Sequence, residues 1–346
     1  MINKNPRPAR RPKVAVIGGG TGLPILLEGL KNADCNVTAI VTVADDGGSS
    51  GSLRNAVSTI PPGDIRNCLV ALSDMKKIYK DVFQYRFSEE DKEFSGHAIG
   101  NLIIAAIAEM RGDTFAALRL LSYMMEVDGK VLPACEEALV LQGHFADGTM
   151  IEGETAVVSH PDQIQEVTVR LANDRPKVDV SGNPITSPRA GREVVSEIMQ
   201  ADMVILGPGS LYTSILPNVA IEEIRNAIVD TPAKVVYICN IMTQLGETEH
   251  FSDADHVRVI NEHLGAKAID TVLLNKTPVP FEYLEGASEK DYLVQITQDR
   301  QGLADQKCQV VGCDFLNLEK SGVYHNQDKL VGAIMDVMND RIKYSE

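Results

Sequence analysis

Short apolar runs alternate along the chain with segments whose apolar residues repeat at helical spacing. Residues 13–18 and 37–44 are short, apolar and rich in β-branched side chains, a pattern that predicts two fully buried strands. Between them, the leucines of residues 23–30 recur at i, i+3, i+4 and i+7, which is one face of a helix. The order strand, helix, strand predicts a βαβ unit with a right-handed crossover.

The second half of the chain repeats this alternation. Residues 202–207, 233–239 and 268–275 are three further candidates for buried strands, separated by segments with a helical pattern. One of these helices is expected to begin at Ser252, where S-D-A-D resembles a capping box, and to end at the glycine of "HVRVINEHLG". A last helix is predicted over roughly 327–343, because its apolar residues form one stripe.

The middle of the chain follows a period of two instead. The stretch "EALVLQGHFADGTMIEGETAVV" alternates apolar and polar residues around a turn at Ala146 to Thr149, which is typical of a β-hairpin. The stretch "QEVTVRLAND" predicts a further strand. We interpret this region, about 135–185, as an antiparallel appendage inserted into the remaining fold.

The predicted fold class is therefore α/β: a mostly parallel sheet flanked by helices, with the inserted antiparallel β appendage. The favoured organisation is a single domain over 13–346, preceded by a disordered basic tail over 1–12. Two lobes divided near residue 150 are the alternative.

Composition narrows the classes of function. Apolar residues make up 44% of the chain, enough for an ordinary core, and 33 basic against 48 acidic residues give a net charge of −15. That charge argues against binding nucleic acid or an anionic membrane through a broad surface, but not against holding a small anion. The six cysteines show neither CxxC nor zinc-ligand spacing, so we expect reduced thiols. Neither a membrane-spanning run nor a signal-peptide segment is present, so we expect a cytoplasmic protein.

The first predicted strand is followed by a glycine-rich turn, Gly18 to Gly22 (GGGTG). In open α/β sheets ligands bind beyond the carboxyl ends of the strands, and glycines there let the backbone approach a phosphate while the next helix directs free N–H groups at it. The dinucleotide-binding fingerprint requires a third glycine where this chain has Leu23, so the match fails. Tight packing of the turn is the alternative to a ligand.

The second strand is followed by Asp45 and Asp46 and then by five small residues, 47–51. Paired carboxylates here can bind ribose hydroxyls, hold a divalent cation that bridges phosphates, or cap a turn. Phosphates beside two carboxylates need Mg²⁺ or an arginine to offset the repulsion. Arg66 is the candidate arginine, and a surface ion pair between Asp64 and Arg66 is the alternative.

Further along, Asn101 begins another predicted helix, as a helix cap or as a contact to a base or ribose. We interpret His97 as structural, because no nucleophile or partner carboxylate can be assigned to it. The loops Gly207 to Ser214 and Asn240 to Thr248 again follow strands and supply amides and hydroxyls. Four such loops in one chain predict a cleft for a ligand that contains a diphosphate.

These loops also carry a family resemblance. The motifs "AVIGGGTGL", "TVADDGGSSG", "PPGDIRN", "GHAIGNLI", "GPGSLYTSILPN" and "YICNIMTQ-GET" resemble the gluconeogenesis-factor (YvcK-type) branch of the CofD-like superfamily, from Lys13 to about residue 340. The resemblance implies a Rossmann-like fold. The founding enzyme of the superfamily is a phospholactate transferase, which moves a phospholactyl group from a nucleotide-activated donor to a deazaflavin. This branch is instead associated with growth on gluconeogenic carbon sources, with cell-wall morphogenesis and with binding of nucleotide sugars such as UDP-N-acetylglucosamine.

The resemblance also implies a set of ligand-binding residues. Tyr283 is a stacking group for the uracil ring, and Tyr324 stands where this branch is expected to have a basic residue before His325, which puts one diphosphate contact in doubt. The remaining implied residues are Gly19, Gly20, Thr21, Gly22, Asp45, Asp46, Arg66, Asn101, Gly207, Gly209, Ser210 and Asn240.

Three functions follow from these patterns. A regulatory nucleotide-sugar-binding protein needs a phosphate cleft but no catalytic pair, and it is favoured. A transferase would use Mg²⁺ at Asp45 and Asp46, the one cofactor indicated, and a nicotinamide oxidoreductase is disfavoured by Leu23. The expected partners are a nucleotide sugar or another nucleotide diphosphate, with cell-wall synthesis regulators and a homo-oligomer compatible with the sequence. No nucleic acid and no membrane insertion are expected.

Overall fold

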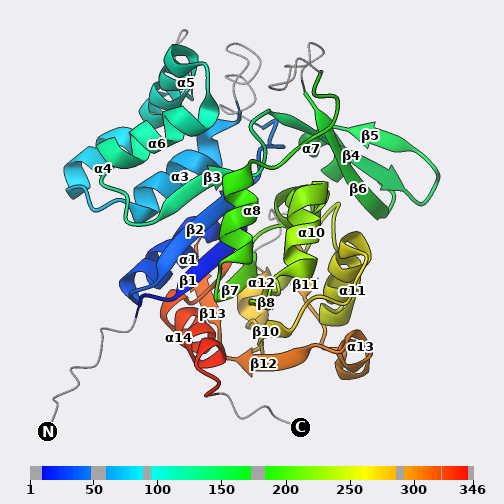
Figure 1. Cartoon of the computed structure of the whole chain (residues 1–346). Helices are drawn as coiled ribbons and strands as arrows, with labels where there is room; N and C mark the ends of the chain where they lie inside the picture. Colours follow the sequence, from blue (N-terminus) through cyan, green and yellow to red (C-terminus); the bar gives the residue numbers. More distant parts are fainter. Residues whose placement is uncertain are drawn as a thin grey trace, which may run out of the picture.

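A seven-stranded parallel sheet forms the centre of the computed structural model, which describes residues 10–47, 60–88, 94, 96–172, 184–285, 292–320 and 322–341 (Figure 1). The strand order is β12-β10-β8-β7-β1-β2-β3, and every neighbouring pair is parallel. The strands are β1 Lys13–Gly18, β2 Asn36–Val41, β3 Lys130–Pro133, β7 Met203–Leu206, β8 Lys234–Ile238, β10 Thr271–Asn275 and β12 Gln309–Cys313. The α/β prediction with a mostly parallel sheet is confirmed.

This sheet crosses the boundary proposed for two lobes. Strand β1 pairs with β2 on one side and with β7 on the other, so chain segments on both sides of residue 150 share one ladder. The two halves of the chain therefore contribute strands to one sheet. The order also reverses at β1, because the chain builds outward through β2 and β3 and then returns to β7. Such a reversal leaves a crevice at the carboxyl ends of the strands.

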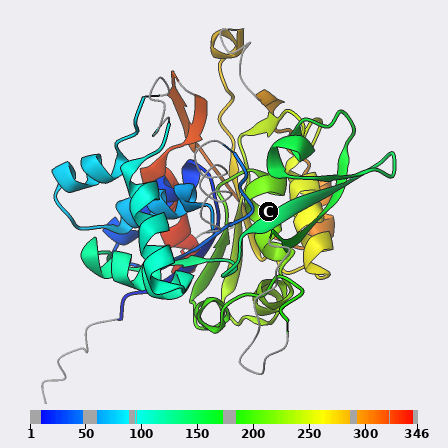
Figure 2. The same cartoon turned by 90° about the horizontal axis from the view of Figure 1, so that it is seen from above.

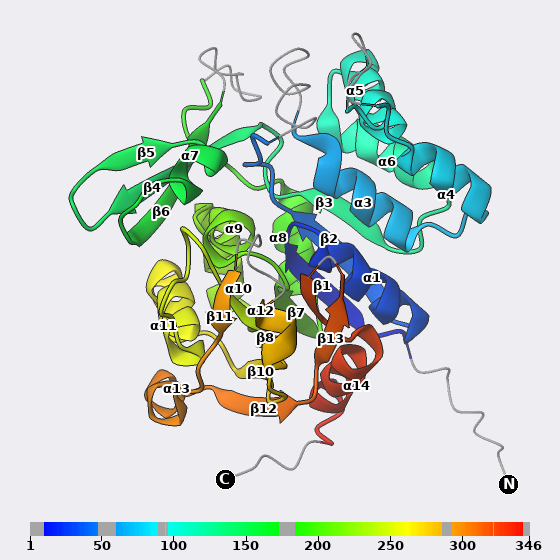
Figure 3. The same cartoon turned by 180° about the vertical axis from the view of Figure 1, so that it is seen from behind.

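Helices cover both faces of the sheet. Helices α8 (Arg192–Met199), α10 (Glu222–Asp230) and α11 (Asp253–Leu264) lie in front of it in Figure 1, and α1 (Gly22–Asn32) and α14 (Gln327–Met338) lie in front of it in the opposite view of Figure 3. The remaining helices are α3 Pro62–Leu72, α4 Lys77–Gln84, α5 Ile99–Arg111, α6 Thr114–Met124, α7 Glu154–Val158, the π-helix η1 Leu211–Ile215, α9 Leu216–Val219, α12 Phe281–Glu285 and α13 Arg300–Gln306. No helix in the described part of the chain is both long and apolar enough to cross a bilayer.

Both helix ends predicted for α11 occur. The Ser252 hydroxyl accepts from the N–H of Asp255 while the Asp255 carboxylate accepts from the N–H of Ser252, and Gly265 ends the helix at φ +69°. The last helix is shorter than predicted, since α14 ends at Met338 rather than near 343. Asp340 adopts φ +52°, a left-handed conformation that cannot continue a right-handed helix.

The antiparallel appendage is also present. Strands β4 (Leu139–Phe145), β5 (Met150–Glu152) and β6 (Ile164–Leu171) form a three-stranded sheet in the order β5-β4-β6. Seen from above, helices α3 to α6 lie on one side of the molecule and this appendage on the other (Figure 2). The segment after β5 forms helix α7 instead of continuing the strand alternation, because Gly153 turns the chain at φ +97°. Two further antiparallel pairs are β9 (Met242–Gln244) with β11 (Tyr292–Gln295), and β13 (Leu316–Glu319) with β14 (Gly322–His325).

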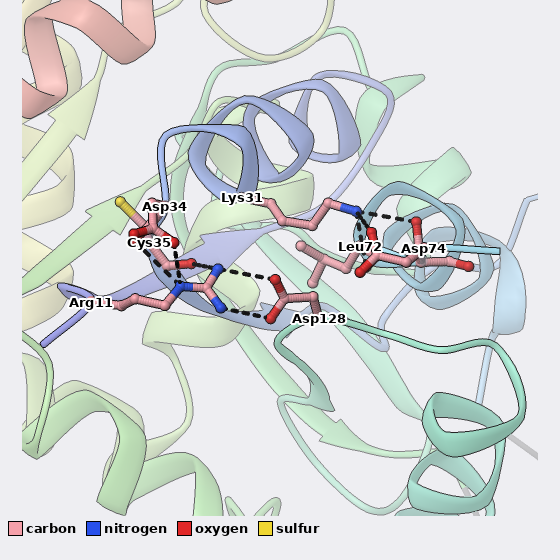
Figure 4. Close-up of polar contacts among 8 residues, drawn as sticks. Arg11, Lys31, Asp34, Cys35, Leu72, Asp74 and Asp128 are labelled. Carbon is pink, nitrogen blue, oxygen red and sulfur yellow. Dashed lines mark hydrogen bonds and ion pairs between the residues drawn. The ribbon is translucent and has the colours of Figure 1, made fainter.

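Carboxylates hold Arg10 and Arg11, just before β1, and Figure 4 shows the contacts of Arg11. Arg11 donates two hydrogen bonds to Asp128, at 2.9 and 3.0 Å, and one to the backbone oxygen of Cys35. Its ion pair with Asp34 is 3.0 Å long, and Arg10 pairs with Asp202 at 2.6 Å. Acidic side chains at the amino ends of the strands therefore bind these two arginines of the predicted tail over 1–12, and residues 1–9 lie outside the described residues. All six cysteines are free thiols.

Candidate functional site

A cavity of about 230 Å³ lies at the carboxyl ends of β1 and β7, where the strand order reverses. Four parts of the chain line it: the turn after β1 with the start of α1, the turn after β7, the loop after β8, and the end of β14 with the start of α14. Residues that contribute polar side chains include Thr21, Ser210, Asn240, Gln244, Tyr324 and His325. The structure thus brings together three of the four loops singled out by the sequence.

The first glycine turn is shaped by close approaches. Gly20 adopts φ +74°, and a Cβ at Gly19 would lie 2.7 Å from both Asp64 Oδ2 and the methyl group of Thr42. That space admits the Asp64 carboxylate, which accepts a hydrogen bond from the N–H of Gly20 at 2.6 Å. Burial raises the pKa of Asp64, although the bond from Gly20 favours the charged form. Asp64 was considered only as a partner for Arg66, and its contact with the turn is a finding of the tertiary structure.

The second glycine turn, after β7, lies against the first. A Cβ at Gly209 would stand 3.0 Å from the backbone oxygen of Gly19, and a Cβ at Gly22 would stand 3.2 Å from Pro208 Cγ. Glycine at these positions therefore lets the two turns pack together. The Gly207–Pro208 peptide bond is cis.

A buried carboxylate also occupies the helix start beyond this second turn. Glu247, only 5% exposed, accepts hydrogen bonds from the N–H of Tyr212 at 3.0 Å and from the Thr213 hydroxyl at 3.2 Å. Burial raises the pKa of Glu247 to about 7, because removing the carboxylate from water outweighs these hydrogen bonds. The sequence contains Glu247 in the quoted "GET" motif, but no pattern indicates that it is buried against a helix start.

The loop after β8 adds a chain of side-chain hydrogen bonds. Asn240 Nδ2 donates to Gln244 Oε1 at 3.1 Å, and Gln244 Nε2 donates to Ser210 Oγ at 2.8 Å. The other polar atom of Asn240, Oδ1, is buried and has no hydrogen-bond partner. A buried acceptor without a donor is costly, so this atom favours a ligand that carries an N–H or O–H group.

The β13–β14 hairpin brings His325 and Tyr324 to the same cavity. His325 Nε2 lies 3.1 Å from the backbone oxygen of Cys239, and since a carbonyl only accepts, Nε2 carries the hydrogen. Burial lowers the pKa of His325 to about 4, so the ring is neutral at pH 7 and its Nδ1 is an acceptor.

The loop after β2 faces the appendage, and Asp45 and Asp46 do not line the cavity. Asp45 accepts from the N–H of Gly47 at 2.8 Å, and Asp46 accepts from the N–H and hydroxyl of Thr155 at 3.2 and 3.0 Å. The capping role considered for these carboxylates is therefore present. Nearby, burial and then the charge of Asp45 raise the pKa of Glu154 to about 9. In the segments described, no three acidic, histidine or cysteine side chains are grouped to hold a metal ion. Residues 48–51 lie outside the described residues.

Arg66 and Asn101 form a buried pair, and neither residue lines the cavity. Arg66 is 5% exposed and Asn101 is 1% exposed, and Arg66 Nη1 donates to Asn101 Oδ1 at 2.8 Å. Arg66 Nη2 donates to Asn67, whereas Arg66 Nε is buried without a partner. Burial lowers the pKa of Arg66 to about 10, which still leaves it charged at pH 7. The alternative of a surface ion pair with Asp64 is wrong, and Asn101 does not cap its helix, since Ala98 holds the N-cap position.

Tyr283 lies one layer behind the cavity wall. Its hydroxyl donates to the backbone oxygen of Glu319 at 2.6 Å, and its ring packs on a small apolar cluster that includes Ile241 and Met242. Both of these residues line the cavity, whereas Tyr283 does not. His97 lies before α5 and outside the cavity lining, and its N–H bonds to the oxygen of Phe94.

Comparison with known proteins shows which family the chain belongs to. Residues 14–316 match the family described as "2-phospho-L-lactate transferase CofD". The chain belongs to the CofD family. Within the CofD family it is 49% identical over 326 residues to the "Putative gluconeogenesis factor" of Lactococcus lactis, covering 94% of this chain and 97% of that protein. It is 40% identical to the "Gluconeogenesis factor" of Listeria monocytogenes, covering 97% and 98%.

A solved structure has the same fold. A Bacillus halodurans protein described as a member of the upf0052 family superposes with a TM-score of 0.86 at 37% identity, covering 94% of this chain and 99% of that chain. The Rossmann-like fold and the resemblance to gluconeogenesis factors are thus confirmed. The CofD match ends at residue 316, before Tyr324, His325 and α14, so part of the cavity wall lies beyond the matched segment.

Proposed function

We propose that this chain is a regulatory protein that binds a nucleotide diphosphate sugar of the UDP-N-acetylglucosamine type at the cavity beyond β1 and β7. In this proposal ligand occupancy, and not turnover, supports growth on gluconeogenic carbon sources and cell-wall morphogenesis. The protein acts in the cytoplasm, where such ligands are found.

The observation that supports this most directly is the meeting of two glycine turns at one cavity. The first N–H groups of any α-helix lack intrahelical partners, and Thr21, the N-cap residue of α1, makes no capping hydrogen bond with its side chain. A diphosphate placed against α1 would satisfy these N–H groups and interact favourably with the helix dipole. The turn with Gly209 and Ser210 supplies a second edge of the same cavity.

Two further features support an anionic, hydrogen-bonding ligand: Asn240 at the cavity, and Arg66, which does not line it. Asn240 Oδ1 is a buried acceptor without a hydrogen-bond donor. The N3–H group of a uracil ring or a sugar hydroxyl would provide one. Arg66 is a buried cation without an ion pair to any described residue. A phosphate brought near Arg66 would compensate a charge that is otherwise expensive to bury. The cavity, at about 230 Å³, is smaller than most ligand pockets, so a nucleotide sugar would fill it in part and extend beyond its rim.

Calorimetry with three ligands tests the binding site. Purified protein is titrated with UDP-N-acetylglucosamine, GDP and NAD⁺, with and without Mg²⁺, and the nucleotides are recovered and analysed for turnover. The proposal expects saturable one-to-one binding of the UDP-sugar with the ligand recovered unchanged. Absence of UDP-sugar binding under all conditions would contradict the proposal. Binding of NAD⁺ alone would support the nicotinamide oxidoreductase instead.

The same titration separates regulation from catalysis. A transferase of the phospholactate type would consume a nucleotide-linked donor only when Mg²⁺ is present. The prediction that Mg²⁺ binds at Asp45 and Asp46 is tested in parallel, because Asp45→Asn with Asp46→Asn should then abolish any effect of Mg²⁺ on affinity. A deletion strain grown on gluconeogenic and on glycolytic carbon sources tests the cellular part, with cell shape as the second readout.

A further inference from the structure

Helix α4 exposes an apolar stripe that no described part of the chain covers. Ile78, Tyr79, Val82 and Tyr85 are 62%, 56%, 50% and 55% exposed, and Phe83 is the buried residue of the helix. Ile78, Val82 and Tyr85 follow the spacing i, i+4 and i+7, so they lie on one face. Isolated exposed apolar residues are common, but a helix whose apolar face points outward marks an interaction site.

Aromatic rings extend this stripe beyond the end of the helix. The rings of Tyr85 and Phe87 meet edge to face with centroids 5.5 Å apart, and Phe87 lies 5.2 Å from Phe94, which is 44% exposed. Figures 1 and 3 place α4 at the outer edge of the molecule, on the side away from the β4–β6 appendage. A large partner can therefore reach the stripe without meeting the appendage.

The charged residues beside the stripe can pair with the same residues of a second copy of the chain. Lys77 and Asp81 are four residues apart and so share one flank of the helix, and neither forms an ion pair with any other described residue. When two copies of such a helix pack antiparallel about a two-fold axis, the same flank of each copy faces the same side. Lys77 then meets Asp81 of the partner subunit, and the contact occurs twice.

We propose that α4 is the contact of a two-fold symmetric dimer of this chain. Ile78 packs against Val82 of the partner subunit, and the reciprocal Lys77–Asp81 pairs set the register. An isologous contact of this kind needs only the surface that this chain presents. The stripe is short, so the dimer is weak and depends on concentration.

Charge reversal tests the register. Sedimentation equilibrium over about a hundredfold range of concentration should show a monomer–dimer equilibrium for the natural chain. Lys77→Asp and Asp81→Lys should each raise the dimer dissociation constant by at least about tenfold, because each places two like charges face to face. The double variant restores both pairs with reversed polarity and should return the constant to within about threefold of the original.

A second pair of variants tests the stripe itself. Val82→Glu should abolish the dimer, whereas Met150→Glu, which places the same charge at a 49% exposed position on β5, should not change it. All these positions are exposed, so the melting temperatures should stay close to that of the natural chain. The proposal would be overturned if the chain is monomeric at every concentration or if Val82→Glu leaves the dimer unchanged. It would also be overturned if the double variant has a dissociation constant as high as those of the two single variants. Binding to anionic vesicles that Val82→Glu removes in a monomeric chain would overturn it as well.

Discussion

The Asp64 carboxylate accepts a hydrogen bond from the backbone N–H of Gly20 at 2.6 Å, so the first glycine turn holds an anion that belongs to the protein. Glu247 does the same at the helix start beyond the second turn, through the N–H of Tyr212. At each turn, therefore, a buried carboxylate already binds one of the backbone N–H groups. A ligand diphosphate has to use the remaining N–H groups, and at the first turn it meets the carboxylate of Asp64.

Removing the charge of Asp64 should strengthen metal-free binding. Asp64→Asn keeps an oxygen to accept from Gly20 while it eliminates repulsion with the ligand phosphates, so affinity for UDP-N-acetylglucosamine should rise by about three- to tenfold. Calorimetry in the presence of a chelator measures this. Asp230→Asn, an equal change of charge at the far end of α10, is the control and should have no effect. Weaker binding of Asp64→Asn without metal would show that the carboxylate itself contacts the ligand.

Removing Arg66 should reduce the affinity for the ligand more than it reduces the stability of the protein. Arg66→Met deletes a buried guanidinium that lacks an ion pair among the described residues, so the affinity for the UDP-sugar should fall by about 1 kcal/mol or more. Stability should change less, because burying an unpaired charge is itself unfavourable. Calorimetry and urea unfolding measure the two effects. The matched control is Arg111→Met, on the exposed last turn of α5, and equal affinities for both variants would exclude Arg66 from the site.

Asn240 should contribute to binding and little to stability. In the free protein its Oδ1 makes no hydrogen bond, so Asn240→Ala loses only the bond from Nδ2 to Gln244. A bound ligand that donates to Oδ1 would lose a buried hydrogen bond worth about 1–2 kcal/mol. The expected result is an affinity lower by about tenfold with a melting temperature within about 2 °C of the original. Asn339→Ala, on the exposed end of α14, controls for the substitution, and unchanged affinity of Asn240→Ala would rule out a ligand donor there.

Glu247 should make stability fall as pH rises. Its pKa is about 7 in the folded protein, above the ordinary value of 4.5, so the folded state binds a proton more tightly than the unfolded state. The resulting stabilisation is complete below pH 4.5 and is lost as pH rises through 7. Glu247→Gln keeps the acceptor for Tyr212 but cannot ionise, so the variant should gain on the order of 2–3 kcal/mol relative to the natural chain between about pH 5 and 8.

Urea unfolding at several pH values measures that difference. Glu249→Gln, two residues along the same loop, is the control and should leave the pH dependence unchanged. A natural chain and a Glu247→Gln variant whose stabilities run parallel across the range would show that Glu247 ionises normally.

The Arg11 ion pairs should stabilise the amino-end edge of the sheet. Arg11→Ala removes two hydrogen bonds to Asp128 and one to the oxygen of Cys35, so the free energy of unfolding should fall by about 1–2 kcal/mol at pH 7. Arg11 lowers the pKa of Asp128, so the part that depends on Asp128 is present above the ordinary carboxylate pKa and lost as pH falls below it. The difference between the two proteins should therefore shrink at acid pH. Arg10→Ala, at a more exposed pair, should cost less than Arg11→Ala, and equal losses would contradict the assignment.

Most of the secondary structure could be predicted from local patterns. The strand at 13–18, the helix from Ser252 to its terminal glycine and the hairpin around Ala146 each follow from a period or a cap that acts within a few residues. The exceptions have local causes that no hydrophobic pattern reports. Gly153 and Asp340 adopt positive φ angles, so α7 replaces a strand and α14 ends early.

The sequence by itself determined the elements and the glycine turns, because strand and helix periodicity and the conformational freedom of glycine are properties of short segments. It also placed Gly20, Gly209 and Asn240 together, since loops that follow parallel strands emerge at the same edge of a sheet. Only the tertiary structure decided which polar groups meet across that edge. Asp64 reaches Gly20, Asp46 caps the appendage, and His325 joins the cavity from beyond the family match, because such contacts depend on distances between residues far apart in the chain.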